Sequence, residues 1–64
     1  MKKVHFTNKS TNESSDVMVG HVGEKVFVIC QNVKETNDAI KWCNTHKTGD
    51  KFESDDYTME IIEG

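Results

Sequence analysis

The stretch Lys25-Val-Phe-Val-Ile-Cys30, together with the residues that follow it as far as Asn44, decides the fold. Its first part is an almost unbroken run of β-branched and aromatic residues, which is typical of a buried strand. From Asn32 onward the apolar residues recur about every three and a half positions, which is typical of an amphipathic helix. This change of period predicts a small α+β domain in which a strand leads into a helix.

The expected helix has recognisable ends. Asn32 and Glu35 fit a capping box at its start, although Thr36 is a competing N-cap one turn later. Gly49 suits the position just after a helix, where a left-handed backbone is common. We therefore expect a helix over about residues 33–47.

The rest of the chain adds strands around this helix. Residues 2–8 alternate between apolar and polar, residues 17–22 pair with 26–31 about a turn at Gly23-Glu24, and residues 57–62 form the last strand. We predict one domain over residues 1–64, with one helix packed on a small, mainly antiparallel four-stranded sheet in the order β-β-β-α-β. A flexible polar loop is expected at about residues 8–16. The residues expected to be largely buried are Val26, Phe27, Val28, Ile29, Ala39 and Ile40.

The small size of the chain limits its core. A domain of 64 residues buries only about 60% of its unfolded surface, and its core is expected to supply no more than about 3–5 kcal/mol of net stability. The expected strand at residues 26–31 is apolar on both faces, whereas a sheet covered by one helix needs only one apolar face. A loop, a second copy or a partner protein is therefore expected to cover the second face.

The residue pattern contains no recognisable catalytic or metal-binding motif. The candidate metal ligands lack the close Cys or His pairs of structural zinc sites; they are His5, His21, Cys30, Cys43 and His46. Ser10, Ser14 and Ser15 lie in the polar segment expected to be a flexible loop, where a catalytic geometry is hard to hold. We expect no enzymatic activity and no cofactor. The two cysteines are expected to be reduced thiols.

Charge is distributed unevenly along the chain. The formal net charge is −3, and residues 50–64 hold six acidic side chains against one lysine. The chain has no arginine, which is the usual side chain for bidentate readout of phosphate or guanine, so direct nucleic-acid binding is not expected. The acidic end is either a solvated edge that keeps the domain soluble or a surface that steers a basic partner.

A partner-binding surface at the acidic end is the functional hypothesis for specific residues. Trp42 either closes the edge between helix and sheet or anchors an interface. The expected contact residues are Trp42, Asp55, Asp56, Tyr57, Glu60 and Glu63. No membrane span or secretion signal is evident, so a cytoplasmic location is expected.

One resemblance bears on the class of protein. The size, the acidity and the expected order of three strands, a helix and a strand resemble small early proteins of bacteriophages. The segment Thr36-Asn-Asp-Ala-Ile-Lys-Trp42 followed by Gly49-Asp-Lys-Phe-Glu53 resembles, in layout, the T7-like phage inhibitor of bacterial RNA polymerase. The resemblance covers residues from about 26 to 62 and rests on spacing. That family contacts the polymerase partly through arginines, which this chain lacks, so no functional residue is carried over.

The resemblance implies a small phage protein that acts on a host protein. The leading expectation is therefore a non-enzymatic protein–protein interaction module that modulates or inhibits a larger host protein in the host cytosol. The alternatives are a self-associating structural or accessory module, such as a homodimer, and an acidic mimic that competes with DNA.

We predict that folding requires no metal, because the His and Cys spacings lack paired ligands. Circular dichroism spectra and melting curves recorded with and without EDTA should coincide. Loss of the folded signal on chelation would contradict this prediction.

Overall fold

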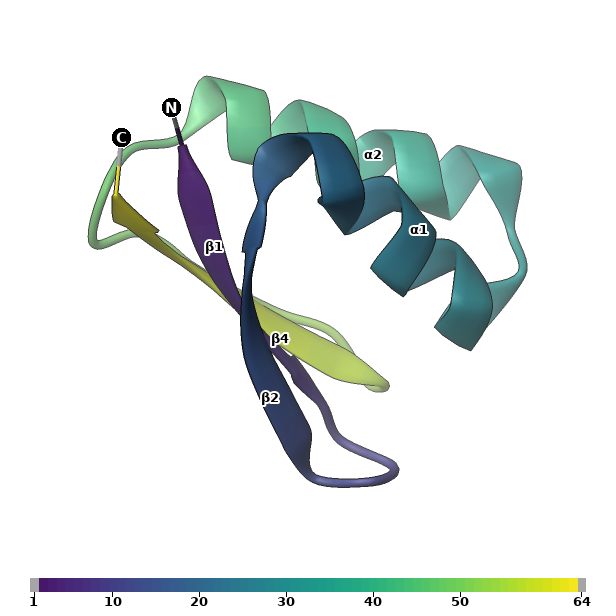
Figure 1. Ribbon diagram of the computed structural model, residues 1–64. Helices are drawn as coiled ribbons and strands as arrows, with labels where there is room; N and C mark the ends of the chain where they lie inside the picture. Colours follow the sequence, from purple (N-terminus) through teal and green to yellow (C-terminus); the bar gives the residue numbers. More distant parts are fainter. Residues whose placement is uncertain (1, 64) are drawn as a thin grey trace.

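The computed structural model describes residues 2–63 and consists of one four-stranded sheet covered on one face by two helices (Figure 1). In chain order the elements are β1 (Lys3–Asn8), β2 (Glu13–Met18), α1 (Val19–Cys30), α2 (Val33–Thr45), β3 (Lys51–Glu53) and β4 (Tyr57–Glu63). The strand order in the sheet is β2-β1-β4-β3, and every neighbouring pair is antiparallel. The α+β class and the four-stranded antiparallel sheet are thereby confirmed.

The order of elements differs from the expected β-β-β-α-β in two respects. Residues 19–30 form helix α1 and not strand, and the expected connection before β4 contains the short strand β3. The spacing of the buried residues shows why this segment is helical. Val22 and Val26 lie four positions apart and are both 0% exposed, and Ile29, one turn later, is partly buried. Phe27 and Val28, expected in the core, are 45% and 76% exposed. The β-branched run therefore gave the wrong period, since burial of one helical face outweighs the modest strand preference of Val and Ile.

The segment expected as a flexible loop at residues 8–16 is largely a β-hairpin. Only residues 9–12 turn, and residues 13–18 pair with β1 as the edge strand β2. The turn is held by main-chain bonds from Asn12 N to Asn8 O (2.7 Å) and from Lys9 N to Asp56 O (2.9 Å). This strand could not be predicted from the sequence, because its polar residues show no alternation of apolar and polar side chains.

The core lies between the inner face of the sheet and the two helices. Alternation along β1 and β4 sends every second side chain inward. The buried apolar residues are Val4, Phe6, Val22, Val26, Ala39, Cys43, Tyr57, Met59 and Ile61. A methyl group at Gly23 would lie 2.9 Å from Cδ1 of Ile40, so this glycine allows α1 and α2 to approach closely.

Helix α2 begins as predicted and ends two residues earlier than predicted. The Asn32 side chain accepts a hydrogen bond from Glu35 N at 3.0 Å, which caps the first turn. At the other end, Lys2 Nζ donates to the carbonyl of Cys43 at 2.9 Å and also to that of His46. A lysine from the start of the chain thus satisfies carbonyls that the helix leaves unpaired.

We predict opposite changes in stability when glycine is introduced at one position with left-handed backbone and removed from another. Gln31 has φ +50° at the C-terminal cap of α1, and Gly49 has φ +99°. Gln31→Gly should raise the free energy of unfolding by about 0.5–1 kcal/mol, because a side chain is strained there. Gly49→Ala should lower it by about 1 kcal/mol.

Urea unfolding of the two variants and the wild-type protein measures both changes. A Gln31→Gly variant that is less stable than wild type would show that the side chain at the cap makes a contact worth more than the strain.

Candidate functional site

The largest exposed apolar side chains gather where α1 is joined to α2. Phe27, Val28 and Val33 are 45%, 76% and 66% exposed, and we call them the helical corner. All three lie within residues 27–33, around the link Gln31-Asn32 that connects the helices. The only comparable side chain among residues 2–63 is Ile62, which is 38% exposed on the last strand. Neighbouring exposed apolar residues of this kind are typical of a surface that contacts another molecule.

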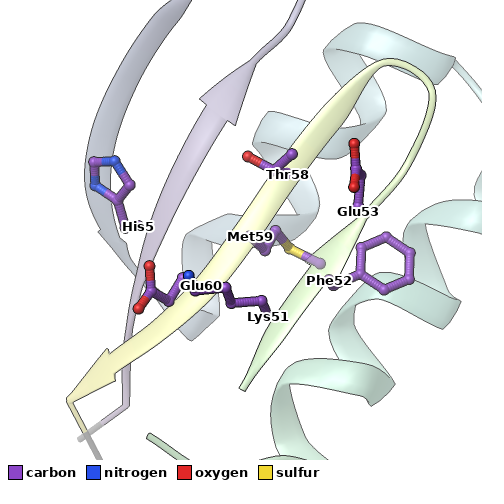
Figure 2. Close-up of a pocket in the computed structure, with 7 residues that line it drawn as sticks. All are labelled: His5, Lys51, Phe52, Glu53, Thr58, Met59 and Glu60. Atoms are coloured by element: carbon purple, nitrogen blue, oxygen red, sulfur yellow. The ribbon is translucent and has the colours of Figure 1, made fainter. Parts of the chain in front are cut away.

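The outer face of the sheet, which no helix covers, is polar and contains a shallow depression of about 420 Å³ (Figure 2). Figure 2 shows His5 on β1, Thr58 and Glu60 on β4, and Lys51 and Glu53 on the edge strand β3. Glu60 lies directly across from both His5 and Lys51 in the sheet register. His5 Nδ1 lies 2.7 Å from Asp16 Oδ1.

This depression lacks the parts of a catalytic site. In the described part of the chain, the His5 ring is hydrogen-bonded to Asp16 and to no hydroxyl or thiol that could serve as a nucleophile. Glu60 and Lys51 bring opposite charges to adjacent strands, as is common on the solvated face of a sheet.

The acidic residues expected to bind a partner lie on different surfaces. Asp55 and Asp56 are exposed in the turn between β3 and β4, and Glu60 is half-buried on the outer face. Glu63 is exposed, and its carboxylate lies 3.8 Å from Lys3 Nζ. At the other end of β4, Glu53 of β3 is 2.8 Å from Lys9 Nζ. The sheet therefore places lysines of β1 and its turn against the acidic end of the chain, so the charges separated in sequence are partly paired in space.

Tyr57 does not belong to this surface, which corrects the expected contact set. It is 1% exposed, and its ring stacks on Phe6 with centroids 5.3 Å apart. Burial raises the pKa of Tyr57 to about 12, and the nearby Glu35 carboxylate adds to the increase. A neutral, buried ring of this kind is part of the core.

Trp42 closes the edge between α2 and the sheet, which is one of the two roles predicted for it from the sequence. Its half-buried ring stacks on His46 at 4.5 Å and packs against Phe52 of β3 at 5.5 Å. His46 Nδ1 lies 2.8 Å from the carbonyl of Trp42, which fixes the imidazole over the indole.

The cysteines and histidines form no obvious ligand set. No group of three or more His, Cys, Asp or Glu side chains within residues 2–63 is placed to hold a metal ion. Cys30 and Cys43 are free thiols. Burial raises the pKa of the Cys43 thiol, partly opposed by the positive charge of Lys2, so this thiol is in its neutral form at neutral pH.

Sequence reasoning missed the helical corner because it assigned residues 26–31 to a central strand. The signal that could have found it is the spacing of Val19, Val22, Val26 and Ile29, which follows one face of a helix and leaves Phe27 and Val28 outside it. Neither helix in the described part of the chain has the length and apolar character required to cross a bilayer.

Comparisons with known proteins give no further identification. The chain has no significant match among protein-family models, curated protein sequences or solved structures.

We predict that Lys9→Met raises the pKa of Glu53. The hydrogen bond and positive charge of Lys9 hold that pKa below its usual value, so the contribution of the pair is present above the usual pKa and is lost as the pH falls through the lowered one. Carboxyl NMR titration measures the change, with Lys47→Met as the control. Identical titration of Glu53 in Lys9→Met and wild type would show that the pair does not persist in solution.

Proposed function

We propose that this chain is a non-enzymatic protein-binding module that contacts a larger partner through the helical corner. The observation that carries the proposal is the exposure of Phe27, Val28 and Val33 at one end of the helical layer. In keeping with the resemblance in layout to small phage early proteins, the partner is a host protein that the chain modulates or inhibits in the host cytoplasm.

The size of the corner is adequate for this role. Full burial of a Val or Phe side chain is worth about 1.5–3 kcal/mol relative to leaving it exposed. A few such residues at the centre of an interface usually supply most of its affinity. Exposure of three on a domain this small has no benefit for folding, so a contact with another molecule is the better explanation.

The acidic turn between β3 and β4 lies at the same end of the sheet as the hairpin tip that faces Val28, and its charge supports association in a secondary way. Asp55 and Asp56 are exposed in the turn between β3 and β4, and charged rim residues mainly change the rate of encounter. Glu53 and Glu63 already have lysine partners. This pairing weakens the alternative of an acidic DNA mimic, for which free carboxylates are needed.

Self-association through the same corner is the second candidate. An apolar surface that lacks a partner can be covered by a second copy, and symmetric dimers are the commonest oligomers. Sedimentation of the purified protein separates the two candidates, because only self-association changes the molecular mass with protein concentration.

We predict that Val28→Asp and Val33→Asp each weaken partner binding by about tenfold or more, because each leaves a charge in an apolar contact. The partner is first captured from bacterial extract on immobilised wild-type protein and then purified, and the dissociation constant is measured for each variant. Thr48→Asp, exposed in the link between α2 and β3, is the matched control for added charge.

Circular dichroism must show that every variant is folded. Folded corner variants that bind the purified partner as tightly as Thr48→Asp would place the interface elsewhere. A dimer that the corner variants dissociate would favour the self-association candidate.

A further inference from the structure

The edge strand β2 has main-chain groups available for pairing. It has β1 on one side, and no other strand within residues 2–63 lies on its second side. The bond from Val19 N to Lys2 O (3.3 Å) continues the register of the β1–β2 ladder. Because bonded and non-bonded pairs alternate in an antiparallel ladder, Glu13, Ser15 and Val17 bond to β1. The N–H and C=O groups of Ser14 and Asp16 therefore point away from the sheet.

A groove of about 350 Å³ lies beside this edge, between the hairpin and the C-terminal half of α1. Figure 1 shows β2 and α1 diverging from their junction, so that the hairpin tip projects away from the helix. The groove is lined on the helix side by Lys25, Val28 and Ile29, and on the strand side by Phe6, Glu13 and Ser15. Phe6 is 4% exposed and Ile29 is partly buried, so they make an apolar floor.

These two features meet the two requirements of strand addition. A segment that pairs with Ser14 and Asp16 gains main-chain hydrogen bonds, and its alternate side chains point to the helix side of the sheet. The groove lies on that side, and Val28 forms part of its wall. An added strand would thus cover the most exposed apolar side chain of the helical corner.

We propose that β2 binds an extended segment of the partner protein as a fifth strand, with alternate apolar side chains of that segment seated in the groove between β2 and α1. The proposal rests on the proposed function, since it names the structure that the partner presents to Val28. The other edge of the sheet, β3, spans only three residues, Lys51–Glu53, and offers a much shorter template.

The charge of the edge selects the kind of segment. Within residues 13–18 the charged side chains are Glu13, on the groove side, and Asp16, on the outer face, and both are exposed. In the antiparallel register that pairs Asp16 with Asp16 of a second copy, two carboxylates would lie directly across from each other, which is unfavourable. A segment in which apolar and basic residues alternate suits both the groove and the edge.

The test uses a hexapeptide of alternating lysine and valine with blocked ends, added to the ¹⁵N-labelled full chain. Peptide addition should shift the amide signals of Ser14, Asp16 and Val28 and slow hydrogen exchange at the first two. A peptide of alternating glutamate and valine should bind about tenfold more weakly or less, at the same ionic strength. Absence of shifts in β2 at about 1 mM lysine–valine peptide, a concentration that detects even weak binding, would overturn the proposal.

A matched pair of variants at one residue tests the main-chain contact. Ser14→Pro removes an N–H that points to solvent, which an edge strand tolerates, and should weaken peptide binding by about tenfold or more. Ser14→Ala keeps the N–H and should bind as wild type does. Both must show the wild-type circular dichroism spectrum; if Ser14→Pro does not, a peptide N-methylated at alternate residues makes the same test on intact protein and should not bind.

The remaining outcomes also decide the question. Equal binding by folded Ser14→Pro and Ser14→Ala, or full binding of the N-methylated peptide, would overturn strand addition. A dimer of the wild-type protein that Ser14→Pro dissociates would show that the edge serves a second copy, contrary to the proposal. If Val28→Asp and Val33→Asp abolish binding of the purified partner and Ser14→Pro does not, the corner is the interface and the strand-addition proposal alone is wrong.

Discussion

The packing of two short helices against one face of a four-stranded sheet is the constraint on which the rest of the structure depends. Val22 and Val26 of α1 and Ala39 and Cys43 of α2 meet the inward residues of β1 and β4 in a single cluster. In a domain of this size burial of that cluster has to provide most of the stability. The close approach at Gly23 and the Lys2 bonds at the end of α2 both serve to hold the helices over the sheet. The side chains that point away from the cluster were thereby left free to form other surfaces.

Prediction from sequence succeeded where the local residue pattern and the burial of side chains in the core favour the same structure. It failed where the two favour different structures. The α+β class, the capped start of α2 and the strand at the C-terminal end followed from Asn32, the helical spacing after it and the alternation from Tyr57. Residues 26–30 were wrongly assigned because β-branched side chains favour strands locally, whereas α1 is stabilised by what its inner face contacts. The polar strand β2 could not be predicted because its pairing is made by the main chain. The helical corner was missed with α1, and of the expected contact residues Tyr57 proved to be core.

The count of charges along the sequence was incomplete, because it did not include the pairing of acidic and basic side chains that the fold brings together. The acidic end of the chain forms the central strand β4 and the turn before it, and β1 with its following turn lies alongside. Lys3 and Lys9 therefore meet Glu63 and Glu53 across more than forty positions of sequence. Exposed pairs of this kind contribute little to stability. Their effect is on the field around the molecule, which is less negative beside Glu63 and Glu53 than the composition indicates.

The position of β4 in the sheet has a consequence for biosynthesis. Among residues 2–63, β4 follows the other five elements in the sequence, yet it lies between β1 and β3 and contributes Tyr57, Met59 and Ile61 to the core. Until residues 57–63 emerge, the nascent chain holds a hairpin and two helices whose apolar faces have no central strand to cover. Folding is therefore expected to finish only after these residues are synthesised, through contacts between distant parts of the sequence that form slowly relative to helix formation.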